Sequence, residues 1–317
     1  MVSKAEREEG AGGEAFGGDA CVDVAIIGGG PAGLTAAIYL ARFRRSVVLI
    51  DANQSRVAKI PRSHNYPGFA EGIAGSALLE SLRSQLQHYD VRTVAAHAER
   101  AQREAGGFTV HWPAGSARAR LLLLATGVTD IAPVMPHVLE AVRAGALRYC
   151  PVCDAFEVID QVVGVYANGP AGVGEAVYLR HFSENVVLFM EEGARTLSPA
   201  ERRRLTEAGI RCPEEAVRSI RHGHTQVTVV HGECETACDT LYCALGLDVH
   251  AQLARALGAR TDDDGYVIVD AHHATNVEGL YAVGDVAQGL NQIAVAAGGA
   301  ATAASAMHRH LGAAARG

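Results

Sequence analysis

The chain has 317 residues, of which 49% are hydrophobic and 20% are charged, and a formal net charge of -7, which is ordinary for a globular protein of about two domains. The negative balance gives no basic surface for nucleic-acid phosphates, and no apolar run approaches the length that spans a membrane. Residues 1–20 lack the apolar stretch of a secretory signal and have the composition of a flexible tail, so we expect a cytoplasmic protein.

The segment after this tail predicts a nucleotide-binding unit. An apolar run, Cys21–Ile27, is followed by a glycine-rich turn, an Ala-rich helical stretch and a second apolar run that ends in an acid. In such a unit the first glycine permits a tight turn, the second lets the backbone approach a pyrophosphate, and the third allows close helix–strand packing. Free N–H groups at the helix start favour the phosphate, and the acid accepts hydrogen bonds from a ribose. The residues of this motif are Gly28, Gly30, Pro31, Ala32, Gly33 and Asp51.

The following elements predict a second unit inserted into the first. Helical spacing covers 73–90, strands follow within 92–123, and a buried run, Leu121–Leu124, leads into Ala125-Thr126-Gly127. A second strand–glycine–helix unit starts at Val162. Its later elements are a strand at 185–190, a helix near 199–208 and a hairpin-like pair at 226–231 and 239–245. The chain then returns to the first unit with a strand at 266–269, the segment 279–285 and an Ala-rich helix over 292–311.

We therefore predict an α/β fold of two nucleotide-binding, Rossmann-like, three-layer domains. The first domain comprises residues 21–131 and 247–317. The second domain, residues 132–246, is inserted into it and carries a cysteine pair.

This pair is Cys150-Pro151-Val-Cys153, followed by Asp154. Two cysteines three residues apart on a helical turn lie about 5–6 Å apart, within the range that a disulfide bridges. A proline suits the first turn of a helix, and the positive helix end favours the thiolate of Cys150. Asp154 can carry protons while the pair opens and closes. The alternatives are half of a zinc site or two buried thiols, but no further ligands have zinc spacing, so we predict a redox pair and no metal.

The other cysteines predict no disulfide framework, because an odd total of seven stands in a long chain. Cys21, Cys212 and Cys243 lie beside apolar residues, which indicates core thiols. Cys234 and Cys238 flank a polar segment. We interpret it as a cysteine-bearing loop, with a second disulfide as the alternative.

Three segments together resemble the low-molecular-weight thioredoxin reductase family: the turn 28–33, Ala125-Thr126-Gly127 and Tyr281-Ala-Val-Gly284-Asp285. The resemblance extends from about residue 21 over nearly the whole chain. It implies FAD as the cofactor, with Asp285 at the ribityl or pyrophosphate part and Asn65 beside the FAD. Asn291-Gln292-Ile293 stands where the family has Arg-Gln-Ala beneath the isoalloxazine; Gln292 matches, and the arginine does not. The cofactor-binding residues so implied, beyond those of the first turn, are Asn65, Ala125, Thr126, Gly127, Gly284, Asp285, Gln292 and Ile293.

The same resemblance implies roles at the pair. Cys153 faces the flavin, Cys150 exchanges with an outside dithiol, and Asp154 matches the acid/base position. Ala155 stands where glycine is usual. The family also forms homodimers, which we expect here.

The second nucleotide unit is degraded at its phosphate site. Pro170 removes a backbone N–H from the turn 167–172, and Glu191 and Glu192 stand where thioredoxin reductases place a basic cluster for the 2′-phosphate of NADPH. Three explanations are open. The unit could bind NADH, with an acid holding the ribose hydroxyls. It could bind no nucleotide and serve as a scaffold for the cysteine pair, or the two acids could pair with Arg202–Arg204 at the surface. We favour the scaffold and do not expect NADPH.

Without a nicotinamide donor, we predict that the chain oxidises a small-molecule dithiol to a disulfide through Cys150–Cys153 and FAD, with molecular oxygen as acceptor. This resembles the dithiol oxidases that close disulfides in gliotoxin, holomycin and romidepsin. The main alternative is an NAD(P)H- or ferredoxin-linked disulfide reductase like thioredoxin reductase. Others are an NAD(P)H oxidase-like or diflavin disulfide oxidoreductase and a non-catalytic FAD-binding redox sensor.

Overall fold

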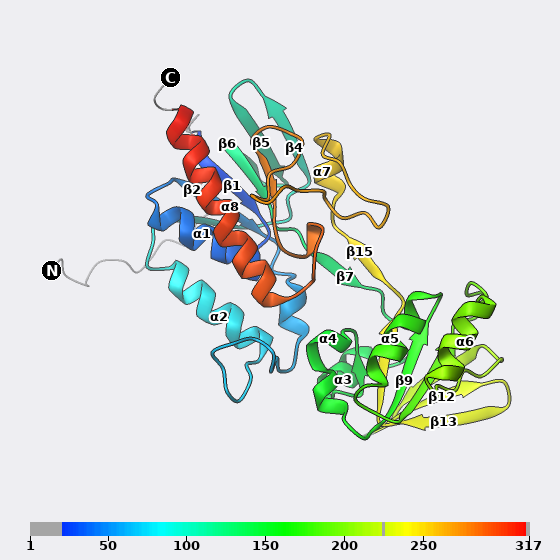
Figure 1. Cartoon of the computed structure of the whole chain (residues 1–317). Coiled ribbons are helices and arrows are strands. Elements are labelled where there is room, and N and C mark those ends of the chain that lie inside the picture. The colour runs from blue at the N-terminus through cyan, green and yellow to red at the C-terminus, as the bar shows by residue number, and fades with distance from the viewer. Residues whose placement is uncertain (1–20, 224–225, 315–317) are drawn as a thin grey trace.

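The computed structural model describes residues 21–223 and 226–314 (Figure 1). The predicted tail, 1–20, lies outside the described residues. Among the described helices, none has the length and apolar character needed to cross a bilayer.

The first of two large sheets has seven strands, in the order β3-β2-β1-β6-β5-β4, with β16 paired to β6. Its centre is parallel, with Ile27 of β1 opposite both Ile50 of β2 and Leu124 of β6. The strands are β1 (Val22–Ile27), β2 (Val47–Asp51), β3 (Arg92–Ala95), β4 (Arg100–Glu104), β5 (Gly107–Trp112), β6 (Gly115–Leu124) and β16 (Leu280–Ala282). Because both faces of this sheet are covered, its central strands are continuous apolar runs.

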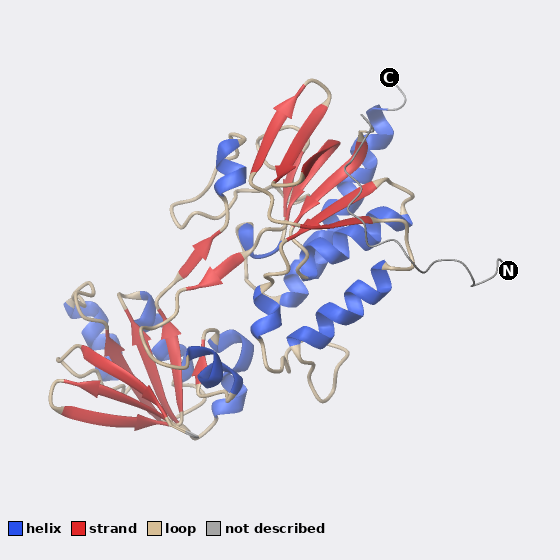
Figure 2. Ribbon diagram, turned by 180° about the vertical axis from the view of Figure 1, so that it is seen from behind, coloured by secondary structure: helices blue, strands red, loops and turns tan. Residues whose placement is uncertain are grey.

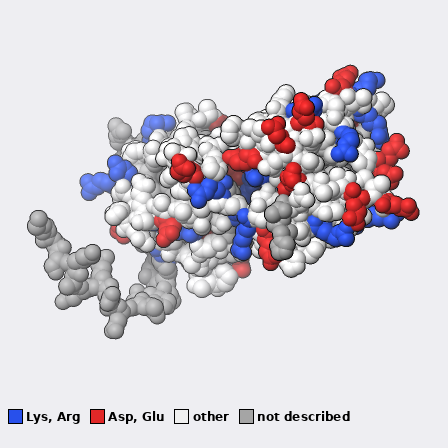
Figure 3. Space-filling view, turned by 90° about the horizontal axis from the view of Figure 1, so that it is seen from below, with Lys and Arg blue, Asp and Glu red and all other residues white. Residues whose placement is uncertain are grey.

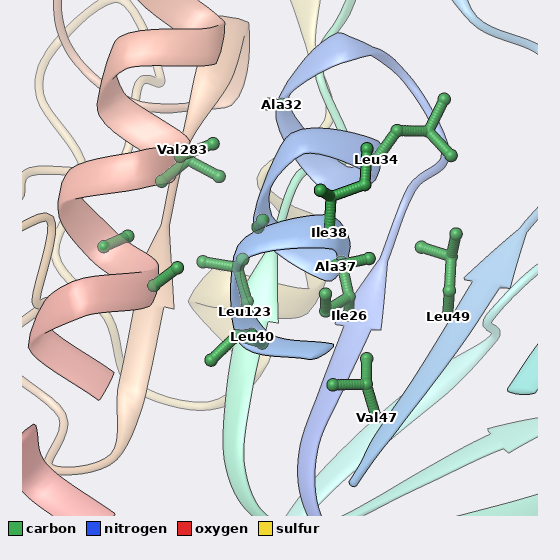
Figure 4. Close-up of a cluster of buried hydrophobic side chains, with 14 of the residues drawn as sticks. Ile26, Ala32, Leu34, Ala37, Ile38, Leu40, Val47, Leu49, Leu123 and Val283 are labelled. Atoms are coloured by element: carbon green, nitrogen blue, oxygen red, sulfur yellow. The ribbon is translucent and has the colours of Figure 1, made fainter. Parts of the chain in front are cut away.

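Alternate residues of β1 pack on opposite faces of the sheet. Ile26 packs under α1 (Pro31–Arg42), next to Leu34 and Ile38 (Figure 4). The helices α2 (Gly75–Leu86) and α8 (Ile293–Ala314) contribute to the same core. Ala25 and its neighbours on the other face pack against α7 (Gln252–Ala256) and the segments around it.

Two short strands connect the sheets (Figure 2). The chain leaves the first sheet on β7 (Val128–Asp130) and returns on β15 (Leu247–Val249). These strands pair antiparallel, with Asp130 opposite Leu247. The predicted domain limits near 131 and 247 fall at this connection and stay a prediction.

The second large sheet has four parallel strands in the order β10-β9-β14-β8. They are β8 (Leu147–Arg148), β9 (Val162–Ala167), β10 (Asn185–Met190) and β14 (Thr240–Ala244). One face packs with α5 (Ala171–Leu179) and α6 (Pro199–Glu207). The other packs with α3 (Val138–Arg143) and a three-stranded sheet of β11 (Val217–His222), β12 (Val227–His231) and β13 (Cys234–Cys238). The predicted α/β class with two Rossmann-like units is confirmed.

Two predicted strand arrangements and the predicted burial of one cysteine are wrong. The strand at 227–231 pairs with β13, whereas β14 joins the parallel sheet, so 226–231 and 239–245 form no hairpin with each other. All five residues of β14 are buried, which suits a central strand covered on both faces. Around 266–269 only isolated bridges form, from Val267 to Thr261 and Ala287. Cys21 is exposed and is no core thiol.

Candidate redox and cofactor site

The predicted glycine turn lies between β1 and α1, and its glycines are required by close backbone contacts. Gly28 has a φ of +108°, and a Cβ on it would lie 2.2 Å from the carbonyl oxygen of Ala125. A Cβ on Gly33 would lie 1.8 Å from the carbonyl oxygen of Gly28. Gly30 is the N-cap of α1 and Pro31 is its first residue, so the first backbone N–H groups of the helix have no capping side chain and are available to a phosphate.

Asp51 is buried at the end of β2, beside this turn. A Cβ on Gly29 would lie 2.0 Å from its Oδ2 atom, so Gly29 is required as well, which the spacing of the motif did not reveal. Asp51 accepts hydrogen bonds from the backbone N–H of Asn53 at 2.9 Å and from Arg83 at 3.3 Å. Each carboxylate oxygen has a second lone pair, so the side chain can still accept a ribose hydroxyl.

Gly284 and Asp285 close the opposite side of the turn. A Cβ on Gly284, whose φ is +71°, would lie 2.9 Å from the Cβ atom of Ala32 in the first turn of α1. Burial raises the pKa of Asp285, and the charge of Arg56 opposes this shift. Arg56 begins the short helix η1 (Arg56–Lys59) and donates to Asp285 at 3.2 Å. No sequence pattern indicated Arg56, because its partners are distant in the chain.

The segment Ala125-Thr126-Gly127 follows β6 at the same edge of the sheet. The hydroxyl of Thr126 donates to the backbone carbonyl of His250 at 2.7 Å, and the N–H of His250 donates to the carbonyl of Gly127 at 3.1 Å. The segment is therefore fixed to the end of β15. A tight turn, a free helix start and a carboxylate thus lie at one sheet edge, and this set of groups fits FAD.

The two cysteines of the predicted pair form a disulfide, with Cα atoms 5.3 Å apart. Cys150 is the N-cap of the four-residue helix α4 (Pro151–Asp154), and Pro151 is its first residue. The helix α4 lies on the side of the second unit that faces the first (Figure 1).

Of the residues predicted to lie beside the cofactor, Gln292 contacts this pair directly and Asn65 contacts Gln292. The side-chain amide of Gln292 lies 3.2 Å from Sγ of Cys153 and 3.6 Å from Sγ of Cys150. Asn65 donates to the Oε1 atom of Gln292 at 2.8 Å and to the backbone carbonyl of Val152 at 3.4 Å. The next residue, Ile293, begins α8. The fold therefore brings the cofactor segments and the disulfide together.

Asp154 is fixed by two residues that the sequence did not indicate. Its Oδ2 atom accepts from Arg148 at 2.7 Å, and its Oδ1 atom accepts from the hydroxyl of Tyr242 at 2.7 Å. Arg148 comes from β8 and Tyr242 from β14. Two short hydrogen bonds of this kind stabilise the charged form of a carboxylate.

In the second nucleotide unit, the turn that follows β9 is held by hydrogen bonds to neighbouring segments. Asn168 donates to the carbonyl of Leu245 at 3.1 Å, and the N–H of Arg195 donates to the carbonyl of Asn168 at 3.3 Å. The guanidinium of Arg195 pairs with Glu201 at 2.8 Å, and Glu191 accepts from the hydroxyl of Tyr166 at 3.4 Å. In the described part of the chain, no ion pair joins Glu191 or Glu192 to Arg202–Arg204, so that explanation of the two acids gains no support.

The remaining cysteines are free. Cys234 and Cys238 lie at the two ends of strand β13, so the predicted loop is wrong and the alternative disulfide is not formed. Burial raises the pKa of Cys238 and of Cys243 to about 12, so these two thiols stay protonated. Cys212 is partly buried.

Basic and acidic side chains are interspersed over the face of the molecule seen in Figure 3.

Comparison with known proteins gives consistent matches over this whole arrangement. The family model described as pyridine nucleotide-disulphide oxidoreductase matches residues 22–301. Thioredoxin reductase of Mycolicibacterium smegmatis is 31% identical over 296 residues, which are 89% of this chain and 94% of that protein. The solved structure of HlmI has a TM-score of 0.86 at 31% identity and covers 94% of this chain and 95% of its own. Thioredoxin reductase from Streptococcus pyogenes MGAS5005 has a TM-score of 0.85 at 26% identity, covering 93% and 100%.

Proposed function

Because the chain belongs to the pyridine nucleotide-disulphide oxidoreductase family and is thioredoxin reductase-like, we propose that its electrons pass between the Cys150–Cys153 disulfide and FAD. The chain is an FAD-dependent disulfide oxidoreductase of the thioredoxin reductase type. The observation that supports the relay is the contact of Gln292, a cofactor-segment residue, with both sulfurs of the pair.

The chemistry of the pair follows from its position. A thiolate of the outside dithiol attacks Sγ of Cys150 and forms a mixed disulfide, and Cys153 leaves as a thiolate. The second thiol of the substrate then attacks the mixed disulfide, which releases the oxidised substrate and the Cys150 thiolate. Asp154 and the solvent take up the two substrate protons. When bound, FAD supplies the two-electron carrier for the reduced pair.

We infer the direction from the second nucleotide unit. Glu191 and Glu192 follow β10, and the basic side chain nearest to them in sequence, Arg195, is paired with Glu201. A 2′-phosphate placed at the end of β10 would meet two carboxylates and a cation that is already engaged. These residues favour oxidation of a small-molecule dithiol, with molecular oxygen as acceptor. A homodimer and a cytoplasmic location belong to the same proposal.

The names of the relatives favour the other direction. Thioredoxin reductases predominate among them, and one relative from Arabidopsis thaliana is named an NADPH-dependent thioredoxin reductase. The expectation against NADPH therefore has no support from the comparisons and depends on Pro170, Glu191 and Glu192. A nicotinamide-linked disulfide reductase is the second candidate function.

Anaerobic mixing of the protein with two different reductants distinguishes the oxidase from the reductase. The FAD-loaded protein is mixed with NADPH or with dithiothreitol while the flavin absorbance is followed. Fast bleaching by the dithiol and slow bleaching by NADPH supports the oxidase, and fast bleaching by NADPH supports the reductase. If neither reductant bleaches the flavin faster than it bleaches a Cys153→Ser variant, the relay itself is refuted.

A further inference from the structure

The carboxylate of Asp154 has a donor on each oxygen. Arg148 donates to Oδ2 and the hydroxyl of Tyr242 donates to Oδ1, both at 2.7 Å. Asp154 directly follows Cys153 and is the last residue of α4, the helix that Cys150 caps. Its side chain therefore cannot turn relative to the disulfide without breaking one of these bonds.

Both donors are themselves held in place. The Nε atom of Arg148 donates to the carbonyl of Gly145 at 3.1 Å. Tyr242 is fully buried on the central strand β14, which pairs with β9 on one side and β8 on the other. Its ring packs in an apolar cluster that includes Val158 and Leu188.

The buried hydroxyl of Tyr242 indicates that this residue does more than fill space in the core. A phenylalanine would fill the same space without bringing a polar atom into the core, and burying a hydroxyl costs free energy unless it is hydrogen-bonded. Burial, followed by the charge of Asp154, raises the pKa of Tyr242 well above its ordinary value, so the phenol remains a donor. Its hydrogen bond is directed at the acid beside the pair.

We propose that Tyr242 is a positioning residue of the redox centre, which together with Arg148 holds Asp154 charged and correctly oriented for proton exchange with the opening disulfide. The proposal rests on the proposed function, because it needs the pair to open and close. Reduction of the disulfide by a dithiol adds two electrons to the pair and releases two protons from the substrate, and the path of these protons depends on the state of Asp154.

Three charged groups face the Tyr242 hydroxyl. They are Asp154 at the end of α4, Arg148 on β8 and Glu157 in the short helix η2 (Ala155–Val158). The Oε2 atom of Glu157 is buried and, among the described residues, has no hydrogen-bond partner. Removing the phenol hydroxyl leaves Asp154 with one donor, and losing a hydrogen bond to a charged carboxylate is expected to move the pH dependence of the reaction to higher pH.

The test compares two Tyr→Phe variants in the same sheet. Tyr242→Phe removes the hydroxyl at Asp154. The matched control, Tyr166→Phe, removes a hydroxyl on the adjacent strand β9 that donates to Glu191 at 3.4 Å. The rate of flavin bleaching by dithiothreitol is measured as a function of pH in single turnovers. FAD content and melting temperature are recorded in parallel.

The acidic limb of the Tyr242→Phe profile is expected about one pH unit higher than in the wild type, the shift that corresponds to losing one hydrogen bond to a charged group. Tyr166→Phe is expected to keep the wild-type profile. An unchanged profile in Tyr242→Phe, with full FAD content, overturns the proposal. If Tyr242→Phe fails to fold, Arg148→Gln replaces it, with the same direction expected.

A second readout separates failure of this inference from failure of the proposed function. If dithiothreitol does not bleach the wild-type flavin, the proposed function fails. The fraction of the pair that is open at equilibrium with dithiothreitol is then titrated against pH by thiol alkylation. A break in that curve that moves in Tyr242→Phe but stays in Tyr166→Phe supports the positioning role, and a break that stays in both overturns it.

Discussion

Arg56 donates two hydrogen bonds to the carboxylate of Asp130, at 2.5 Å and 2.9 Å. Asp130 ends β7, the strand on which the chain leaves the first sheet. The same guanidinium reaches Asp285 at 3.2 Å. The guanidinium of Arg56 therefore joins the connecting strand β7 to Asp285, the acid that is predicted to bind the cofactor.

Arg56→Gln is expected to lower the affinity for FAD by about tenfold. The substitution leaves Asp130 and Asp285 without their cation, and two uncompensated, partly buried carboxylates repel the FAD pyrophosphate. The measurement is a titration of the flavin-free protein with FAD, followed by flavin fluorescence. Arg120→Gln is the control, because Arg120 pairs with Asp23 at the opposite end of β1. Equal affinity in the two variants would contradict the assignment.

Cys150→Ser and Cys153→Ser are each expected to abolish turnover with a dithiol and to leave FAD bound. Either change removes the disulfide, while the glycine turn at the first sheet is untouched. Oxygen consumption with a dithiol measures the loss of turnover, and the flavin absorbance spectrum measures whether FAD stays bound. Cys234→Ser, at an exposed free thiol, is expected to behave as the wild type. Turnover that persists in either variant of the pair would exclude it as the relay.

The double variant Glu191→Arg, Glu192→Arg is expected to speed bleaching of the flavin by NADPH by about tenfold, since it replaces two repulsive charges with phosphate partners. The bleaching rate under anaerobic conditions is the measurement. Glu184→Arg adds positive charge beside the other end of β10 and should change nothing. If the double variant matches the wild type, the loss lies elsewhere in the turn, for example at Pro170.

Glu175 is expected to make the protein less stable as the pH rises. Burial raises the pKa of Glu175 from 4.5 to about 7, and in the described part of the chain its buried Oε2 atom has no hydrogen-bond partner. Between these two values the folded chain holds a proton that the unfolded chain has lost, so the free energy of unfolding falls with rising pH. The full cost, up to about 3 kcal/mol, applies above the folded pKa.

Glu175→Gln should therefore raise the melting temperature near pH 8 and change it little near pH 5. Glu80→Gln, at an exposed position on α2, is the control and should change neither value. A stabilisation by Glu175→Gln that is equal at both pH values would show that burial of the charge is not its cause.

The parts of the site that follow one another in the chain could be predicted from the sequence. The turn 28–33 and the pair Cys150–Cys153 each depend on residues a few positions apart, and local geometry fixes their shape. Arg56, Arg148 and Tyr242 were missed. Tyr242 lies 88 positions from Asp154, and Arg56 lies 229 positions from Asp285, so only the fold shows these contacts.

The fold was predictable for a similar reason. Long apolar runs with glycine turns between them predict parallel units, whereas strand partners depend on burial that the pattern does not reveal. The strand 240–244 shows this, since its complete burial places it in the parallel sheet beside β9 rather than beside the strand that precedes it.

The pairing of Asp130 with Leu247 has a consequence for how this architecture can be taken apart. The chain enters the second unit after Asp130 and returns to the first unit at Leu247, and these two residues are neighbours in the β7–β15 pair. A tight turn between those positions would close the first unit on itself, with the glycine turn and Asp285 kept. We therefore expect a chain without the inserted stretch to keep the predicted FAD-binding turn in its present position.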